Sequence, residues 1–257
     1  MESLSIVKIG GKIINDQNLL STFLDSFQQI RGAKILVHGG GRAATELSKK
    51  MGVDVKMIEG RRITDEATLN IAVMTYAGLI NKTIVATLQS LGCKSIGLSG
   101  ADANIIQSHK REVKDIDYGF VGDIDKVDGD FLRQIINLNI VPVLCPITHD
   151  NQGQLFNTNA DTIAAKVTQA MSQHYTVNLK YCFEYNGVLE DLNDPNSILQ
   201  IVTETDSTRY ISSGVFADGM IPKVENAFNA LKNGAGSVHI CGIDHVHKDS
   251  PGTNFIL

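Results

Sequence analysis

The sequence lacks the features that mark nucleic-acid-binding, membrane-spanning or secreted proteins. Its 257 residues carry 23 basic and 28 acidic side chains, for a net charge of −5, and contain no basic run. This balance argues against a nucleic-acid partner. No apolar run reaches the ~18 residues needed to span a membrane. No charged and then apolar leader opens the chain, so we expect no signal peptide and a cytoplasmic protein.

Cysteine and histidine are too scattered to predict a metal or redox site. The four cysteines are Cys93, Cys145, Cys182 and Cys241. They form no C-x-x-C pair, and they fit small core residues in a reducing compartment. The histidines form no H-E-x-x-H motif, and His245-x-His247 fits a solvated loop better than a metal pair. We therefore name no protein ligand for a metal.

The apolar pattern alternates strands and helices along the chain. Strands are expected at 4–9, 34–37, 95–98, 140–145, 177–185, 238–241 and 254–256. Helices are expected at 16–30, 42–51, 65–91 (bent near Gly78), 129–138, 161–171 and 222–233. The polar stretch 103–127 predicts a β-hairpin. Alternation of this kind favours an α/β fold around a parallel sheet. If there are two lobes, 151–158 is the expected boundary.

Two lysines stand where a positive charge is unfavourable. Lys8 lies inside the apolar run Leu4–Ile9, directly before Gly10-Gly11. Lys223 falls in the first turn of the helix expected at 222–233, although cations are stabilised at the opposite end of a helix. A lysine in such a place usually has an anion to meet. The two together predict a site that handles moving negative charge.

Three consecutive glycines predict an anion site after the second strand. Gly39-Gly40-Gly41 stands between the strand at 34–37 and the helix at 42–51, and Arg42 follows. Glycines let backbone N–H groups approach a ligand closely, and a helix N-terminus adds partial positive charge. Gly10-Gly11 repeats the arrangement after the first strand, although a single pair is weak support.

Two known nucleotide-binding motifs were compared with these glycines. The Walker pattern G-x-x-x-x-G-K-[ST] is absent. Gly39-x-Gly41-x-x-Ala44 fits the loose dinucleotide fingerprint, and Glu59 lies near the distance expected of a ribose-binding acid. A dinucleotide-dependent oxidoreductase is therefore an open alternative. Hydride transfer would leave Lys8 and Lys223 without a role.

Two polar motifs add candidate ligand contacts. Asn157-Thr158-Asn159-Ala160-Asp161 precedes the helix at 161–171. One short polar residue suffices as a helix N-cap, so two asparagines and an aspartate predict further contacts with a ligand. Arg61-Arg62 precedes the long helix at 65–91. Arginine can fork a carboxylate through two hydrogen bonds, although paired loop arginines are often simply solvated.

As an ordered set, these motifs resemble the amino acid kinase family, and within it the kinases that act on N-acetylglutamate. The matching segments are Val7–Gly11, His38–Gly41, Gly60–Thr64, Asn81-Lys82, Gly97–Gly100, Gly119–Gly122, Asn157–Asp161, Asn186–Leu189 and Asp218–Lys223. The resemblance implies a three-layer α/β/α sandwich around a mainly parallel sheet, as in carbamate kinase-like folds. Residues 1–157 would bind the acyl amino acid and form a dimer. Residues 158–257 would bind ATP on the same continuous sheet.

The resemblance also implies a reaction. The side-chain carboxylate of N-acetyl-L-glutamate would take the γ-phosphoryl group of ATP, giving an acyl phosphate and ADP. This is the second step of arginine biosynthesis. Mg²⁺ would be carried on the ATP phosphates. A carboxylate nucleophile has a pKa of about 4 and needs no general base, which fits the absence of an activated serine or histidine motif.

The roles of individual residues follow from the same resemblance. Lys8 and Lys223 would stabilise the transition state from opposite lobes, with Asp161 orienting both. The phosphoryl group would meet the N–H groups of Gly10, Gly11 and Gly40. The expected contacts of the acyl amino acid are Gly40, Gly41, Arg62, Asn157 and Asn159. The expected contacts of ATP are Glu184, Tyr185, Asn186, Gly187, Val188, Leu189, Val215, Phe216 and Ala217.

The sequence departs from the family pattern on the nucleotide side. Glu184 stands in place of an aspartate, and Phe183 in place of a small hydroxyl residue. Only a short polar stretch separates Gly242 from Gly252-Thr253, so we expect a more open nucleotide lobe or one completed by a neighbouring subunit. We expect no extra N-terminal helix of the kind that forms hexamers in arginine-inhibited relatives. A homodimer through the helix at 65–91, without arginine feedback, is the expected assembly.

Three alternatives stay open at this point. The same kinase chemistry on N-succinyl-L-glutamate would need more room and another cationic partner. The oxidoreductase based on Gly39-x-Gly41-x-x-Ala44 leaves the motif Asn157–Asp161 unexplained. A non-catalytic ligand sensor would fit the departures at Glu184 and the C-terminus, but it would not need both Lys8 and Lys223.

Overall fold

A central eight-stranded sheet forms the middle layer of the structure. The computed structural model describes residues 1–58, 61–191, 193–216, 220–250 and 252–257. In order across the sheet, the strands are β12 (Ile201–Thr203), β14 (Thr253–Ile256), β13 (Ser237–Gly242), β11 (Thr176–Phe183), β1 (Ser3–Ile9), β2 (Ala33–His38), β8 (Val141–Leu144) and β5 (Ser95–Leu98). Neighbours pair parallel except β13 and β14.

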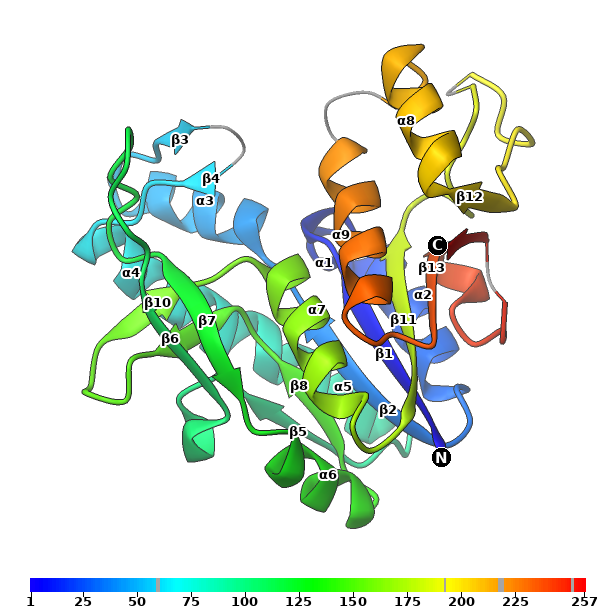
Figure 1. The fold of residues 1–257 in the computed structure, drawn as a ribbon. Coiled ribbons are helices and arrows are strands. Elements are labelled where there is room, and N and C mark those ends of the chain that lie inside the picture. Colours follow the sequence, from blue (N-terminus) through cyan, green and yellow to red (C-terminus); the bar gives the residue numbers. More distant parts are fainter. Residues whose placement is uncertain (59–60, 192, 217–219, 251) are drawn as a thin grey trace.

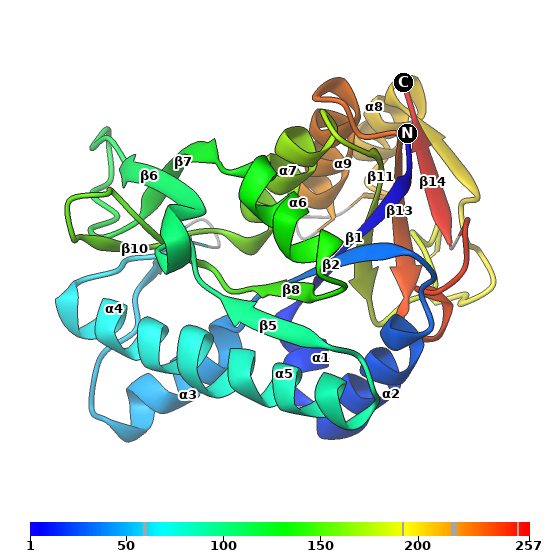
Figure 2. The ribbon, with the colours of Figure 1, turned by 90° about the horizontal axis from the view of Figure 1, so that it is seen from below.

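Helices cover both faces of this sheet, as Figures 1 and 2 show. One layer contains α1 (Gly11–Asn15), α2 (Gln17–Gln28), α3 (Gly41–Lys50), α4 (Glu66–Val73), the π-helical segment η1 (Met74–Ile80) and α5 (Asn81–Ser90). The other contains α6 (Gly129–Asn137), α7 (Ala160–Met171), α8 (Glu204–Ser212) and α9 (Ile221–Lys232). The expected three-layer sandwich around a mainly parallel sheet is confirmed.

Strand β1 shows why the sheet has two cores. Its side chains alternate between the faces, so Leu4 and Ile6 join the core under α7 and α9, whereas Val7 and Ile9 join the core under α2 and α5. Lys8 therefore points to the same side as Leu4 and Ile6, toward α7.

A second sheet lies beside the first. Its order is β10 (Leu155–Asn157), β9 (Ile147–His149), β6 (Ile106–Lys110) and β7 (Gly122–Val127). The antiparallel pair β6–β7 confirms the hairpin expected at 103–127. Residues 151–158, expected as a lobe boundary, contain the turn and strand β10 of the β9–β10 hairpin. Strands on both sides of residue 157 take part in the large sheet.

Several short elements were not expected from the sequence. The two-residue strands β3 (Met57–Ile58) and β4 (Arg61–Arg62), helix α1 and strands β9, β10 and β12 are too short to show a period. Helix α8 buries only Ser207, so it has little apolar face, but its capping box of Thr203 and Asp206 is a start signal that the sequence displays. Two further short elements, η2 (Asp102–Asn104) and η3 (Ile243–His245), are one-turn 3-10 helices.

The helix expected at 65–91 is continuous through α4, η1 and α5. The expected bend near Gly78 coincides with the π-helical segment, where the hydrogen-bond register changes. Residues 66–90 are long and apolar enough to cross a membrane by length and composition, since an 18-residue window within them has a mean hydropathy of 1.4. Core helices of soluble proteins pass the same test, and the inner face of this one packs on the sheet through residues such as Ile84 and Leu88.

Two other buried lysines, Lys34 and Lys180, hold backbone ends in place. Lys34 Nζ donates to the carbonyls of Phe27, Gln28 and Ile30 at the end of α2, at 3.3, 2.7 and 2.9 Å. Lys180 Nζ donates to carbonyls of the polar stretch after β13, at 2.7 and 3.0 Å. The short C-terminal stretch is thus fixed to the sheet, and β14 then pairs with β13.

Candidate active site

Two glycine turns meet at the carboxyl ends of β1 and β2. In the sheet, β1 has β2 on one side and β11 on the other. The chain passes from β1 to β2 on one side, and the later strand β11 is added on the other side. Open α/β sheets bind ligands at such a point, outside the carboxyl ends of the strands. Gly39 N donates to Ile9 O at 3.1 Å. A Cβ on Gly11 would lie 3.9 Å from Gly41 N. The helices α1 and α3 start from these turns, so N–H groups from two helix ends face one region.

Gly40 is the tightest point of the second turn. Its φ is +156°, and a Cβ there would lie 2.6 Å from Ile80 Cδ1 and 2.8 Å from Tyr76 Cδ1. Glycine is therefore required for both backbone conformation and space.

His38 supports the same turn as a neutral side chain. Its Nδ1 donates to Gly39 O at 2.8 Å, and its Nε2 accepts from Asn81 Nδ2 at 3.1 Å. Complete burial lowers the pKa of His38 to about 4. The imidazole is uncharged and both nitrogens are used, so His38 holds the glycine turn and is not placed to act as a base.

The ion pair between Lys8 and Asp161 joins the first strand to α7. Lys8 Nζ lies 2.7 Å from Asp161 Oδ1, and Lys8 is only 7% exposed. Asp161 stands in the first turn of α7, where a negative charge is favoured by the helix dipole. The N-cap Asn159 accepts from Asp161 N at 2.7 Å and Thr162 N at 3.2 Å.

Lys223 reaches the same place from the first turn of α9. The Phe183 ring centroid lies 4.0 Å from Lys223 Nζ and 5.7 Å from Lys8 Nζ. An aromatic face attracts both ammonium groups without occupying an N–H in a conventional hydrogen bond. Burial, and then the Lys8 charge, lower the pKa of Lys223, while Glu184 and Asp161 oppose that shift.

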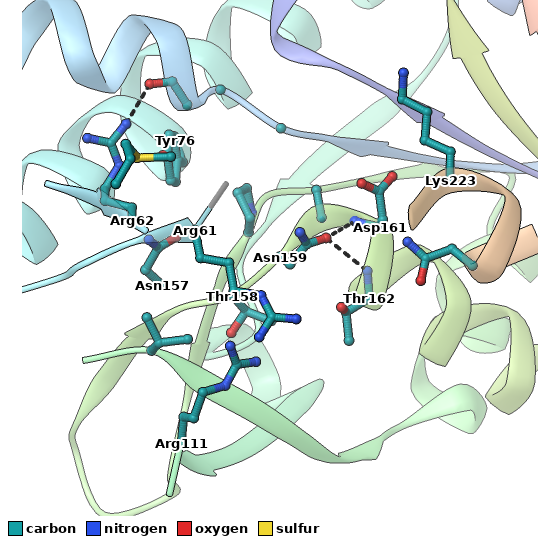
Figure 3. Close-up of a pocket in the computed structure, with 18 of the residues that line it drawn as sticks. Arg61, Arg62, Tyr76, Arg111, Asn157, Thr158, Asn159, Asp161, Thr162 and Lys223 are labelled. Carbon is teal, nitrogen blue, oxygen red and sulfur yellow. Dashed lines mark hydrogen bonds between the residues drawn. The ribbon is translucent and has the colours of Figure 1, made fainter. Parts of the chain in front are cut away.

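A cavity of about 580 Å³, hereafter the larger cavity, opens beside Asp161 and Lys223 (Figure 3). All five residues expected to bind the acyl amino acid line it: Gly40, Gly41, Arg62, Asn157 and Asn159. Asp161 and Lys223 also line it. Gly10, Gly11 and Lys8 are absent from its wall; Lys8 is linked to the cavity by Asp161.

Arg62 and the two asparagines are partly committed to the protein. Arg62 Nη2 donates to Gly41 O at 2.8 Å and Thr45 Oγ1 at 2.7 Å. Asn157 Nδ2 donates to Thr64 Oγ1 at 3.1 Å. Because Asn159 Oδ1 caps α7, its Nδ2 is the part that can meet a ligand. The capping role weighed from the sequence is therefore real for Asn159.

A smaller cavity of about 200 Å³ lies on the other side of Lys223. Six of the residues expected to contact ATP line it: Glu184, Tyr185, Gly187, Leu189, Val215 and Phe216. Phe183, Met220, Lys223 and Ile240 complete its wall. Lys223 is thus common to both cavities.

Two expected ATP contacts lie elsewhere, and a third is undetermined. Val188 is 1% exposed in the core, and its N–H donates to Thr253 Oγ1 at 2.8 Å. The Asn186 side chain packs against the backbone of Gly242. Both therefore support the neighbouring strands and do not line the cavity. Ala217 lies outside the described residues, as do Glu59, Gly60, Asp218 and Gly219.

Reasoning from the sequence missed an ion pair between the two sides of the site. Lys12 Nζ, in α1, lies 2.9 Å from Glu184 Oε1. Burial alone would raise the pKa of Glu184, but the hydrogen bond from Lys12 and nearby positive charges hold that pKa below its usual range. Glu184 thereby keeps a negative charge close to Lys223. Lys12 directly follows the Gly10-Gly11 pair, which was the available signal.

Two arginines of the larger cavity were also missed or undervalued. Arg61 and Arg111 line it together with Arg62. Arg61 stood in a recognised motif, whereas Arg111 comes from the hairpin region, whose polar sequence gave no sign of which side chains face the cavity. The larger cavity is therefore strongly cationic, suited to a ligand with more than one carboxylate or other acceptor group.

Known proteins match this chain closely. The amino acid kinase family model matches residues 3–242. An acetylglutamate kinase from Bacteroides fragilis is 48% identical over 248 residues, covering 96% of this chain and 95% of that protein. One from Phocaeicola vulgatus is 49% identical over 249 residues, covering 97% of each chain.

The fold is shared with more distant proteins of known structure. Carbamate kinase from Giardia lamblia bound to AMP-PNP aligns with a TM-score of 0.70 at 12% identity, covering 100% of this chain and 99% of that chain. At this identity the likeness shows the fold alone. The family match over most of the chain and the two close relatives carry the assignment: this chain belongs to the amino acid kinase family.

Proposed function

We propose that this enzyme transfers the γ-phosphoryl group of ATP to the side-chain carboxylate of N-acetyl-L-glutamate in arginine biosynthesis. The observation that carries the proposal is Lys223, which borders both cavities. A cation shared by two binding sites can neutralise a group that passes from one to the other. The acetylglutamate kinase relatives agree with this chemistry and give no support to the succinyl alternative.

The larger cavity is proposed to bind the acyl amino acid. Its reacting carboxylate would lie near Lys223, Gly40 and Gly41, where N–H groups and an ammonium group converge. Arg62 has a buried Nη1 without a partner among the described residues. A buried donor without an acceptor is unfavourable, and the substrate α-carboxylate would satisfy it. Asn157 and Asn159 would contact neighbouring polar groups.

The smaller cavity is proposed to receive the nucleotide. Its wall is mostly aromatic and aliphatic, with Phe183, Leu189, Val215 and Phe216, which suits the flat faces of an adenine base. The phosphates would extend past Lys223 toward the turns at Gly10-Gly11 and Gly40. In this arrangement residues 158–257 hold the base of ATP, while the acyl amino acid lies between side chains of residues 1–157 and the segment from Asn159 to Asp161 with Lys223.

The transfer itself requires alignment and charge neutralisation. A carboxylate oxygen forms a bond to the γ-phosphorus while the bond from that phosphorus to the β–γ bridging oxygen breaks, and ADP leaves with the electron pair. No proton is transferred. Lys8, Lys223 and the glycine N–H groups would stabilise the negative charge on the transferring group. Asp161 would hold Lys8 in position.

Mg²⁺ is proposed to enter with the nucleotide. The described residues contain no cluster of three or more histidine, cysteine, aspartate or glutamate side chains able to hold a metal. In sites that bind a nucleotide, Mg²⁺ is usually held by substrate phosphates with one or two carboxylates and water. The ion would supply charge neutralisation at the phosphates.

An assay of ADP release with MgATP tests the function. We expect turnover with N-acetyl-L-glutamate, and trapping by hydroxylamine should show an acyl phosphate formed in equal amount with ADP. L-glutamate and L-aspartate serve as non-acylated comparisons, and N-succinyl-L-glutamate as an acceptor with a longer acyl group. If no acyl glutamate is turned over, the kinase assignment is wrong.

Replacing either active-site lysine should abolish most of the activity. Lys8→Met and Lys223→Met remove an ammonium group from the transferring phosphoryl group, so kcat should fall roughly a hundredfold or more. Lys166→Met, at an exposed position on α7, is the matched control and should leave kcat unchanged. Near-normal turnover in a folded Lys8 or Lys223 variant would exclude the role proposed for that lysine.

The pH dependence of kcat should report the loss of the proton from Lys223. Because its pKa is already lowered by burial and by Lys8, activity should fall at the alkaline side as Lys223 loses its proton. Glu184→Gln removes a negative charge that raises this pKa, so the alkaline limb should move to lower pH. Glu190→Gln, an exposed change of equal charge, is the control. An alkaline limb that Glu184→Gln leaves in place would contradict this view.

The assembly is proposed to be a cytoplasmic homodimer formed through the helix at 66–90. Met74 and Leu79 on this helix are 48% and 65% exposed, and a partner helix would cover them. Sedimentation equilibrium should give twice the 27.9 kDa mass of one chain, and Leu79→Glu should weaken the association. A monomer at micromolar concentration, or a hexamer, would overturn this assembly.

A further inference from the structure

Arg111 faces the larger cavity from the wall opposite Lys223. It follows β6 and lines the cavity together with Met57, Arg61 and Val121. In Figure 3, Arg111 and Lys223 lie on opposite sides of the view, with Asn159 between them. The reacting carboxylate belongs near Lys223, so Arg111 stands at the other end of whatever binds here.

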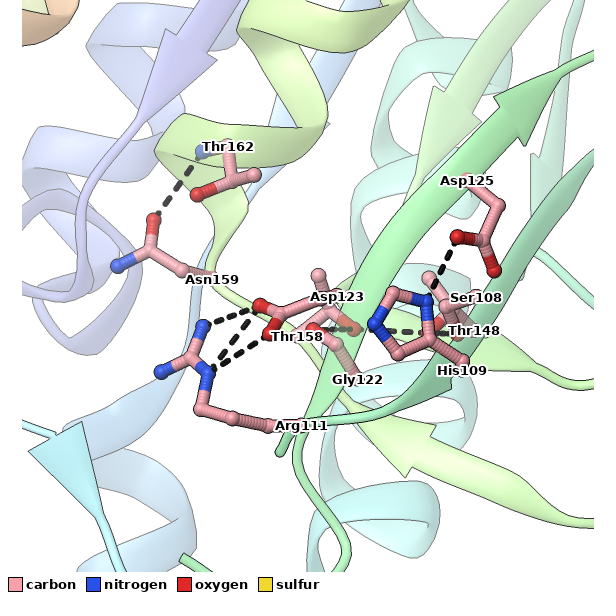
Figure 4. Close-up of polar contacts among 10 residues, drawn as sticks. All are labelled: Ser108, His109, Arg111, Gly122, Asp123, Asp125, Thr148, Thr158, Asn159 and Thr162. Carbon is pink, nitrogen blue, oxygen red and sulfur yellow. Dashed lines mark hydrogen bonds and ion pairs between the residues drawn. The ribbon is translucent and has the colours of Figure 1, made fainter. Parts of the chain in front are cut away.

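The guanidinium group of Arg111 is held rigidly. Its Nε lies 3.1 Å from both carboxylate oxygens of Asp123 on β7, and Nη2 also donates to Asp123 (Figure 4). The Tyr118 ring centroid lies 5.7 Å from Arg111 Cζ. Arg111 N donates to Val121 O at 2.8 Å. The hydrogen bond with Asp123 raises the pKa of Arg111 and lowers that of Asp123, so both groups stay charged.

This fixed orientation leaves one nitrogen unused. Arg111 Nη1 is buried and has no hydrogen-bond partner within the described parts of the chain. Because Asp123 and the Arg111 backbone hold the side chain, it cannot easily turn Nη1 toward bulk water. A buried donor of a charged group without an acceptor costs free energy, so the site is built to receive an acceptor.

The hydrogen-bonded region around Arg111 is part of the same rigid wall. Ser108 and Thr148 lie 2.7 Å apart through their hydroxyl oxygens, as do Thr148 and Thr158, and Thr158 also donates to Gly122 O at 3.3 Å. This buried chain links β6, β9 and β7 to the segment that leads into α7. The hairpin that carries Arg111 and Asp123 is thereby fixed to the segment that leads into α7.

We propose that Arg111 Nη1 donates a hydrogen bond to an oxygen of the substrate acyl group and so selects acylated over free glutamate. The inference rests on the proposed kinase function. Arg62 donates to Gly41 O of the glycine turn, where the reacting carboxylate is proposed to lie, and its own unpartnered Nη1 is already proposed to meet the α-carboxylate. Arg111 lies on the wall opposite Lys223 and would contact the acyl group of the substrate. The acceptor is the amide carbonyl or, on a longer acyl group, a terminal carboxylate.

The test combines one variant with three substrates. Arg111→Met should lower kcat/KM for N-acetyl-L-glutamate roughly tenfold to a hundredfold, the usual effect of losing a charged hydrogen bond. The loss should appear in KM for the acyl substrate, with KM for ATP unchanged. L-glutamate, which lacks the acyl oxygen, should lose little. N-succinyl-L-glutamate distinguishes the acceptors, because a terminal carboxylate contact predicts a larger loss for it than for the acetyl compound.

Equal losses for acylated and free glutamate, or no loss at all, would overturn the proposal. Asp123→Asn should reproduce part of the KM effect, since it loosens the guanidinium, and thermal unfolding would show that each variant is folded. Asp125→Asn is the matched control, because Asp125 pairs with the exposed His109 on the same hairpin and is not part of the cavity wall. If the unmodified enzyme turns over N-acetyl-L-glutamate but Arg111→Met shows no selective loss, this inference fails and the proposed function stands. If the unmodified enzyme shows no turnover, the proposed function itself fails.

Discussion

The ion pair between Lys8 and Asp161 is the contact on which the candidate site depends. It joins the end of the first strand to the first turn of α7, two segments 153 positions apart that the sheet brings together. The strand alternation that gives β1 two apolar faces also decides that Lys8 points at α7. A buried ammonium group without an acceptor would be strongly destabilising. Lys34 and Lys180 meet backbone carbonyls, whereas Lys8 meets the carboxylate of Asp161.

The second cation creates the main electrostatic problem of the site. Burial, and then the nearby charge of Lys8, lower the pKa of Lys223, because two like charges in a partly buried place repel. Asp161, Glu184 and the Phe183 ring offset that repulsion in different ways. The carboxylates supply negative charge from the sides, and the ring supplies a weak attraction to both ammonium groups. The departures at Phe183 and Glu184 thus fit the electrostatics of a working cation pair.

Residues that oppose their surroundings were informative at Lys8 and Gly40, which lie at the candidate site. The same signal at Lys34 and Lys180 marks lysines that hold backbone carbonyls instead. Arg111 could not be found this way, because an arginine in a polar hairpin is ordinary and its direction depends on Asp123, twelve residues away. Asn186 and Val188 show the opposite error: a motif was recognised, but which of its side chains face the cavity depends on the packing of β13 and β14.

The two cavities that share Lys223 differ in chemistry, and that difference supports the ligands proposed for them. The smaller wall is mainly aromatic and aliphatic, whereas the larger one carries Arg61, Arg62 and Arg111 with amide side chains. A dicarboxylate placed among aromatic side chains would lose its hydration without compensation, whereas the arginines of the larger cavity can supply that compensation. The proposed placement of the two ligands follows this difference. Their charged ends would then meet near Lys223, which borders both cavities.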